Sequence, residues 1–281
     1  MLSLNIKVKS LLLRWKNGNI CVTLHPKKRI WQSKPSLITS FSMAQLNKAP
    51  LLEVILELTW QSVELEKFQL KAGALCSRLE NDYATPTNLL PDPNMPISAA
   101  IGKPVYRCVC NKDPKLMFQI GPGLLSVNYV GQTYEWDSFL SEVKTIVESF
   151  MATFKFEHNN QLGLNLKYVD FFPYNFAQQG HVLDFVREKF HIDVNAEFLD
   201  DIKELGLRTG HITDAGIFRF VLNTAQLLKS KEIGFIVESQ INNIVPVNDN
   251  TEFSSKICRA HEYLSGFFKM MTGGELYESF K

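Results

Sequence analysis

Hydrophobic and polar side chains alternate along residues 51–60 and again along residues 162–172. In the first run the apolar positions are Leu52, Val54, Leu56, Leu58 and Trp60. Alternation of this kind places apolar side chains on one face of a strand and polar side chains on the other. Both runs are therefore predicted to be half-buried strands.

Apolar side chains recur at helical spacing between residues 136 and 154, which predicts the clearest helix in the chain. Trp136, Val143 and Phe150 fall on one side of this helix. Thr133 is predicted to cap its first turn. Weaker patterns predict further helices over residues 63–79, 182–190 and 253–271.

Short apolar runs predict additional strands over residues 105–110, 116–120, 124–130, 217–223 and 233–241. Prolines accumulate between residues 84 and 104, which predicts a long surface loop there. The expected order is β-α-β-β-β-α-β followed by β-β-α. This order predicts an α+β fold with an antiparallel sheet, whose first portion is ferredoxin-like with one extra strand. We expect one continuous body over residues 43–281, with residues 175–215 as the place of any subdivision.

Charge is distributed unevenly along the chain. Residues 1–42 hold eight of the 30 basic side chains and none of the 29 acidic ones, so the remainder has 30 − 8 = 22 basic against 29 acidic side chains. An acidic body lacks the broad basic surface with which many proteins bind nucleic acid through its phosphates. A local basic patch would still be compatible with nucleic acid.

The basic leader, residues 1–42, is predicted to lie outside the fold. Met43 follows it, and residues 43–50 resemble an ordinary protein start, so the leader is interpreted as an upstream extension. A targeting segment is a second interpretation, because the leader is basic, free of acid and contains serine. A structured arm is the third.

The five cysteines include no Cys-x-x-Cys pair, which favours a reducing compartment and a cytoplasmic location. Cys108 and Cys110 share one face of a predicted strand and are interpreted as small buried hydrophobic residues. The longest apolar runs are far shorter than the roughly 20 residues that span a bilayer, so no membrane helix is expected.

Five short motifs follow one another along the body. They are Ala49-Pro50-Leu51-Leu52-Glu53-Val54, Gly121-Pro122-Gly123-Leu124-Leu125-Ser126, Tyr134-Glu135-Trp136, Leu166-Lys167-Tyr168-Val169-Asp170, and Ala260-His261-Glu262 with Phe267, Phe268 and Thr272. In this order they resemble a sporadically distributed prokaryotic family of unknown function, over about residues 50–276. The family favours an Arg-Tyr-x-Asn strand, whereas this chain has Lys167 and Asp170 at those places, so the resemblance implies no catalytic arginine there.

Glu53 and Glu57 are the first catalytic candidates, since they share one face of a predicted strand and paired carboxylates can act as acid and base or hold a cation. Four strand positions separate them by about 13 Å, too far for one ion without a third ligand. A solvent-facing strand surface is therefore the favoured interpretation. Lys167, on another predicted strand, is a further candidate.

His261 and Glu262 complete the catalytic candidates. His261 falls on the apolar stripe of the last predicted helix, where a histidine is more often a hydrogen-bonded core residue than a base. A structural role is favoured, and a site formed with Glu262 is the alternative.

Tyr134, Trp136, Tyr168 and Asp170 are the binding candidates. Tyr134 and Trp136 flank the start of the strongest helix, where they could stack on a base or sugar, although packing at the helix start is favoured. Lys167 and Asp170 lie three positions apart on one strand, so they are expected to face opposite ways.

Neither a metal nor a cofactor is expected from the sequence. The histidines lack the spacing of metal ligands. Gly121-Pro122-Gly123 is followed by a predicted strand and lacks the Gly-Lys-Ser/Thr of a phosphate-binding loop, so it is interpreted as a turn.

Two classes of function follow from these patterns. The first is a binding or interaction module whose partner is another protein, consistent with an accessory of a mobile or defence locus as the sporadic family suggests. The second is an enzyme acting on nucleotides or nucleic acid, with a site assembled from Glu53, Glu57, Lys167 and His261. Convergence of three of these residues in one concave pocket would favour the enzyme. The sequence indicates no oligomeric state.

Overall fold

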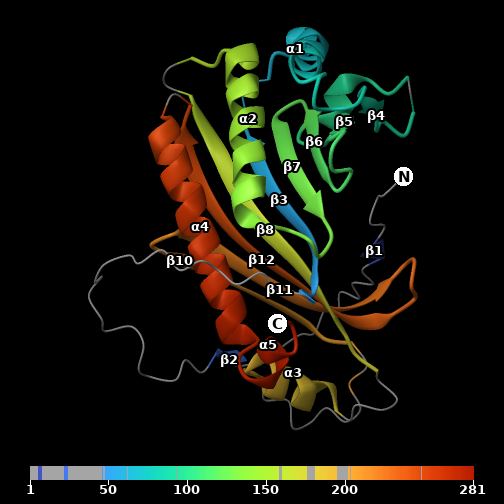
Figure 1. Ribbon diagram of the computed structural model, residues 1–281, viewed down its shortest axis with the longest axis vertical. Helices are drawn as coiled ribbons and strands as arrows, with labels where there is room; N and C mark the ends of the chain where they lie inside the picture. The colour runs from blue at the N-terminus through green and yellow to red at the C-terminus, as the bar shows by residue number, and fades with distance from the viewer. Residues whose placement is uncertain are drawn as a thin grey trace, which may run out of the picture.

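The computed structural model describes residues 6–7, 22–24, 46, 48–61, 63–92, 94–157, 160–175, 181–194, 202, 204–247 and 249–281. A large antiparallel sheet runs through the molecule, and helices cover one of its faces (Figure 1). This confirms the α+β class. The ferredoxin-like arrangement of the first portion remains a prediction, because strands of both portions belong to the same sheet.

The elements follow the predicted order closely. In the first half they are β3 (Leu51–Thr59), α1 (Leu65–Arg78), β4 (Thr87–Asn88), the 3₁₀ helix η1 (Ile97–Ala100), β5 (Tyr106–Val109), β6 (Leu116–Gly121), β7 (Leu124–Val130) and α2 (Trp136–Phe154). In the second half they are β8 (Gln161–Pro173), α3 (Val182–Phe190), β9 (Ile192–Val194), β10 (Gly206–Thr213), β11 (Gly216–Leu227), β12 (Ile233–Pro246), α4 (Asn250–Met271) and α5 (Glu275–Glu278). The strands β9 and β10 and the short helix α5 are absent from the sequence prediction. The Pro-rich loop contains β4 and η1.

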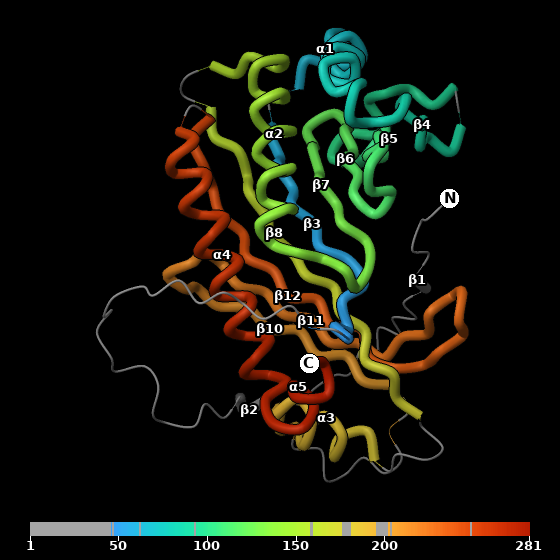
Figure 2. The backbone as a smooth tube through the Cα atoms, viewed as in Figure 1, coloured from blue at the N-terminus to red at the C-terminus, as the bar shows by residue number. Residues whose placement is uncertain are grey.

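The two halves repeat one plan. Each begins with a strand and a helix, later contains a meander of three strands (β5–β7 or β10–β12), and ends with a long helix. β3 and β8 pair with each other at the centre, although they are far apart in the sequence (Figure 2). Outward from β3 the order is β7, β6, β5, and outward from β8 it is β12, β11, β10. The sheet therefore has an approximate two-fold relation between its halves.

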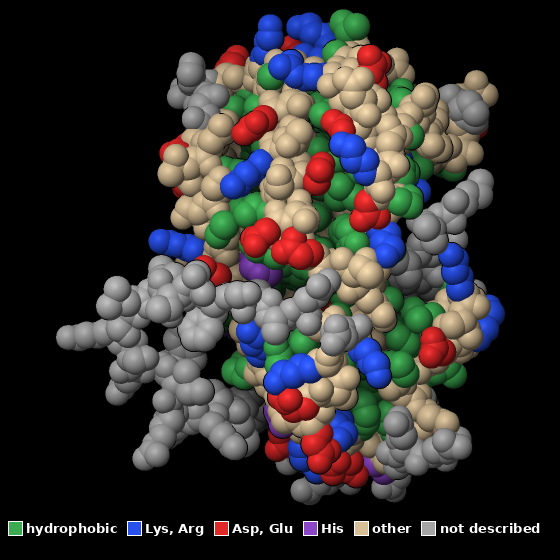
Figure 3. All heavy atoms as spheres, viewed as in Figure 1, with side chains coloured by type: hydrophobic (Ala, Val, Ile, Leu, Met, Phe, Trp, Pro, Cys, Tyr) green, Lys and Arg blue, Asp and Glu red, His purple; other side chains and the backbone are tan. Residues whose placement is uncertain are grey.

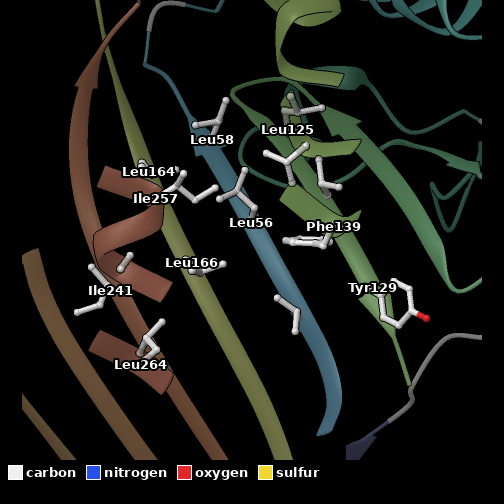
Figure 4. Packing of buried hydrophobic residues seen from close by; sticks show 14 of the residues in the cluster. Leu56, Leu58, Leu125, Tyr129, Phe139, Leu164, Leu166, Ile241, Ile257 and Leu264 are labelled. Carbon is white, nitrogen blue, oxygen red and sulfur yellow. The ribbon is translucent and has the colours of Figure 1, made fainter. Parts of the chain in front are cut away.

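The main core lies between the sheet and the helices. Leu56 of β3, Leu164 of β8 and Ile241 of β12 project toward the side where α2 and α4 contribute Phe139 and Ile257 (Figure 4). Aromatic contacts place two further helices on this face: Phe68 of α1 stacks on Tyr106 of β5, and Phe185 of α3 stacks on Phe235 of β12. Burial of these apolar side chains is the main favourable contribution to folding.

Two local details differ from the sequence prediction. The start of α2 is capped by Glu135 rather than Thr133, because the Glu135 carboxylate accepts hydrogen bonds from the backbone N–H groups of Asp137 and Ser138. Leu52 does not join the helix-side core. A register irregularity between Leu51 and Glu53 adds one residue to β3, so Leu52 packs with a small cluster on the other face.

The helix-covered side carries acidic and basic side chains in mixture over α2 and α4 (Figure 3). None of the helices in the described ranges is long and apolar enough to cross a bilayer.

Most of the leader lies outside the described residues. Two short strands within it are described: β1 (Ile6–Lys7) pairs with β11, and β2 (Val22–Leu24) pairs with β9. That residues 1–42 lie outside the fold thus remains a prediction. Removing these two ladders by truncation tests it.

A chain that begins at Met43 is expected to unfold within about 2 °C of the full chain, because losing ladders of two and three residues changes the free energy of unfolding little. Thermal unfolding followed by circular dichroism measures this. A decrease of several degrees would show that the leader is an integral part of the fold.

Candidate functional site

The face of the sheet opposite α1–α4 presents a broad array of polar side chains, which we call the polar sheet face. It is formed by Arg107 of β5, Gln119 of β6, Ser126 and Asn128 of β7, Glu53 and Glu57 of β3, Asn165 and Lys167 of β8, Gln240 and Asn242 of β12, and Arg219 of β11. Their positions follow from the alternation of the strands, since each lies next to a residue that points into the helix-side core.

The pairing registers align these side chains in two rows across the strands. One row runs through Gln119, Ser126, Glu57, Asn165 and Asn242. The next runs through Asn128, Ile55, Lys167, Gln240 and Arg219. Directly opposite residues on neighbouring strands have Cβ atoms about 5 Å apart. The rows are therefore continuous lines of side chains, most of which can donate or accept hydrogen bonds.

Hydrogen bonds organise the part of this face nearest β3. Asn128 Nδ2 donates to Glu53 Oε1 at 2.7 Å, and Asn128 Oδ1 accepts from Ser126 Oγ at 2.9 Å. Asn165 Nδ2 donates to Glu57 Oε2 at 2.8 Å. Two buried atoms here have no partner: Arg107 Nε, a donor, and Asn165 Oδ1, an acceptor. These two atoms can therefore take a further hydrogen-bond partner, either water or a bound molecule.

The electrostatics of the face centre on Glu53. Burial raises the pKa of this carboxyl above its usual range, against the opposing effects of the Asn128 hydrogen bond and the nearby Lys167 and Arg107 charges. Lys167 is opposite Ile55 in the register, midway between Glu53 and Glu57. The charges on this face are thus mixed, because the carboxylates Glu53 and Glu57 share it with the cations Lys167 and Arg107.

Exposed isoleucines border the polar rows at one corner of the same face. Ile212 of β10 is directly opposite Ile217 of β11, and Ile244 of β12 is two residues beyond Asn242, the partner of Ile217. Their exposed fractions are 85%, 47% and 58%, respectively. We call these three residues the isoleucine patch. Such grouped exposure of large apolar side chains is typical of surfaces that contact another molecule.

A second group of candidate residues lies on the helix side of the sheet, and we call it the aromatic–histidine cluster. Tyr134, just before α2, shares a 2.9 Å hydrogen bond with Tyr168 of β8 through their hydroxyl groups. The Tyr168 hydroxyl is also 2.6 Å from Nδ1 of His261 on α4. The His261 ring stacks on Trp136 of α2, with ring centroids 3.8 Å apart and planes 5° apart. The cluster therefore joins α2, β8 and α4.

The protonation of this cluster follows from its burial. Burial, with a smaller contribution from Lys269, lowers the pKa of His261 to about 4, so the ring is neutral at pH 7. A neutral ring can accept the Tyr168 O–H at Nδ1, and Tyr168 can in turn accept the Tyr134 O–H. Burial alone raises the pKa of the nearby Asp170 carboxyl to about 7. Tyr134, Tyr168 and His261 therefore form a linear hydrogen-bonded chain on the helix side of the sheet.

The sequence candidates therefore separate into two groups. Glu53, Glu57 and Lys167 share the polar sheet face. The other group comprises Tyr134, Trp136, Tyr168, Asp170 and His261, on the helix side. Glu262 is exposed on α4 and belongs to neither group.

His261 is 7% exposed, in agreement with its predicted place on the apolar stripe. It cannot form one site with Glu53, Glu57 and Lys167, because the sheet lies between them. Within the described residues, no group of three His, Cys, Asp or Glu side chains is arranged to hold a metal ion.

A small cavity of about 220 Å³ lies elsewhere, between the start of α1 and the end of α2. Trp60, Phe154 and Phe156 form its aromatic wall, and Lys71 and Glu157 are among its polar lining residues. None of the sequence candidates lines this cavity. Three of the candidates, Glu53, Glu57 and Lys167, therefore lie together on the polar sheet face and not in this cavity.

Several residues of the polar sheet face are not identified by the sequence patterns. Gln119, Ser126 and Asn128 each interrupt an otherwise apolar strand and are nonetheless buried. That interruption is a usable signal, since a polar residue inside a buried strand usually has a specific partner. Arg107 gives no such signal, because its strand is predicted from the flanking apolar residues alone.

No protein-family model matches this chain, and neither a curated protein nor a solved structure is significantly similar to it. The resemblance of the ordered motifs to a sporadic prokaryotic family therefore remains a hypothesis.

Proposed function

We propose that this protein is a binding module that holds a partner protein on the polar sheet face. The observation that carries the proposal is that the isoleucine patch and the two polar rows lie side by side on one face. Protein interfaces combine apolar contacts with hydrogen bonds and bridging water in this way. The central strands β3 and β8 each pair with a neighbour on both sides, so this face of the sheet is expected to change little when a partner binds.

The chemistry of the face favours a protein over a nucleic acid. Its side chains are mainly aliphatic, amide and charged, and these groups match the backbone and side chains of another protein. Proteins that bind single-stranded nucleic acid usually offer aromatic side chains on which bases stack. Among the described strand residues on this face, Phe171 is the aromatic one, and it is buried. The mixed charges support selection of a partner by charge complementarity.

Two substitutions at exposed positions test the proposal. Ile217→Thr keeps a β-branched side chain but removes apolar contact, and Arg219→Glu reverses a charge in the polar row. Each is expected to weaken the partner's binding by about tenfold or more, as at other interface hot spots. The effect of Arg219→Glu should decrease at high salt, whereas that of Ile217→Thr should persist.

The partner is first obtained by co-purification from the native host at low and high salt, and its affinity is then measured by titration. Lys144→Glu is the matched control, because Lys144 is exposed on α2, on the opposite side of the sheet. Equal affinity of the wild type and both test variants would refute the proposed surface. An interface on the helix side would instead be sensitive to the Lys144 change.

An enzyme acting on nucleotides or nucleic acid is the second candidate function. The observation that favours it is the shared face of Glu53, Glu57 and Lys167, with the pKa of Glu53 raised by burial. A screen of nucleotides and nucleic acids for turnover tests this function. Turnover that is lost in Glu53→Gln, with the fold intact, would establish the enzyme and displace the binding module.

A further inference from the structure

Two cysteines from distant parts of the sequence meet beside the core. Cys76 is in the last turn of α1, and Cys108 is in β5. Their Sγ atoms are 3.4 Å apart and share a hydrogen bond. A disulfide requires an S–S distance of about 2.05 Å, so a relative movement of about 1.4 Å would bring the sulfurs to bonding distance.

The two thiols differ in their access to solvent. Cys76 is half-buried, whereas Cys108 is 1% exposed. The hydrogen bond from Cys108 lowers the pKa of Cys76, and the same hydrogen bond together with burial raises the pKa of Cys108. Cys76 is therefore the thiol that reacts first with a dissolved oxidant, and Cys108 is placed to react second.

We propose that Cys76 and Cys108 form a reversible, peroxide-sensitive disulfide that links α1 to β5. This inference is independent of the binding function, because it rests on the contact between the two sulfurs and on their unequal exposure.

The reaction with a hydroperoxide is balanced in two steps. The Cys76 thiolate attacks the terminal peroxide oxygen, so an S–O bond forms and the O–O bond breaks, and the leaving group takes a proton to become an alcohol, or water for hydrogen peroxide. Cys108 then attacks Cys76 Sγ, forming the S–S bond and releasing hydroxide, which takes the Cys108 proton and leaves as water. Two thiols are oxidised and one peroxide is reduced.

The link would constrain a defined part of the chain. It closes the segment from residue 76 to residue 108, which contains the Pro-rich loop, β4 and η1. It also fixes β5, where Arg107 is adjacent to Cys108 and points to the polar sheet face. Closing a loop of this size restricts the unfolded chain, so the oxidised protein should melt higher than the reduced protein by roughly 5–10 °C.

The test uses the full chain treated with hydrogen peroxide, followed by alkylation of the remaining thiols after unfolding and peptide mapping by mass spectrometry. The expected product is one Cys76–Cys108 cross-linked peptide, which dithiothreitol converts back to two free thiols. Cys76→Ser should lose the cross-link and the increase in melting temperature. Cys258→Ser, which removes a similarly half-buried thiol on α4, should retain both.

Three results would overturn the proposal. Both thiols could stay open to alkylation at peroxide levels that oxidise Cys258, or Cys76 could proceed to sulfinic acid without a cross-link. A cross-link between Cys108 and Cys110 would also contradict it, because the sulfur in hydrogen-bond contact with Cys108 is that of Cys76. Cys76→Ala serves as a second variant if the serine change reduces stability.

Discussion

Replacing Val143 with aspartate is expected to prevent the chain from folding. Val143 is fully buried in α2, in the core between that helix and the sheet. The substitution would place a carboxylate there without a charge partner, a change that costs several kcal/mol even when the carboxyl becomes protonated. Since small and medium-sized domains are stable by only about 5–15 kcal/mol, soluble expression should be lost or sharply reduced.

Thr145→Asp is the matched control, because Thr145 is exposed two residues further along the same helix. It introduces the same side chain and should change the free energy of unfolding by about 0.5 kcal/mol or less. Soluble yield and urea unfolding measure both variants. A Val143→Asp protein with ordinary stability would contradict the position of α2 over the core.

The second large effect is expected from Asp170→Asn, as a change in how stability depends on pH. Asp170 is 4% exposed, and burial raises the pKa of its carboxyl from 3.8 to about 7. At pH 8 the group is ionised in both states, so the folded protein bears the full cost of a buried charge. The difference between the two pKa values corresponds to roughly 4 kcal/mol.

The sign follows from proton uptake. A carboxyl whose folded pKa is raised binds protons more tightly in the folded state, so wild-type stability should increase as pH falls through about 7 toward 4. The amide side chain introduced by Asp170→Asn would not titrate, so the variant should be more stable at pH 8, and its advantage should nearly vanish by pH 4.

His261 contributes in the opposite direction, because its lowered folded pKa destabilises the folded state as pH falls from 6.5 toward 4. That contribution is present in both proteins and cancels in the difference between them. Urea unfolding at several pH values between 4 and 8 gives the comparison. A difference that does not vary with pH would show that Asp170 has an ordinary pKa.

The sequence predicts elements best where one local pattern determines them. The predicted bounds of α2, residues 136–154, are confirmed, because its apolar side chains recur over five turns. Strand β10 is not predicted from the sequence. It contains Gly206, Gly210 and exposed polar residues, so apolar and polar side chains do not alternate along it. Its formation depends on pairing with β11, a tertiary effect that local propensity does not contain.

The candidate sites show the same division. Alternation correctly places Glu53 and Glu57 on one face of β3, and Lys167 and Asp170 on opposite faces of β8. It cannot show that Asn128 donates to Glu53, because the register between β3 and β7 is set by the assembled sheet.

The repeated plan of the two halves has a consequence for how the chain folds. Each half can form its own meander from contacts between near neighbours, but the central ladder joins β3 to β8 across almost the whole first half of the body. Closing so long a stretch of chain costs more conformational entropy than forming a hairpin. The ladder between β3 and β8 is therefore expected to form after the meanders. Until it does, the inner strand of each half has one unpaired edge, since β3 pairs only with β7 and β8 only with β12, and the molecule resembles a dimer whose two subunits are joined by a tether.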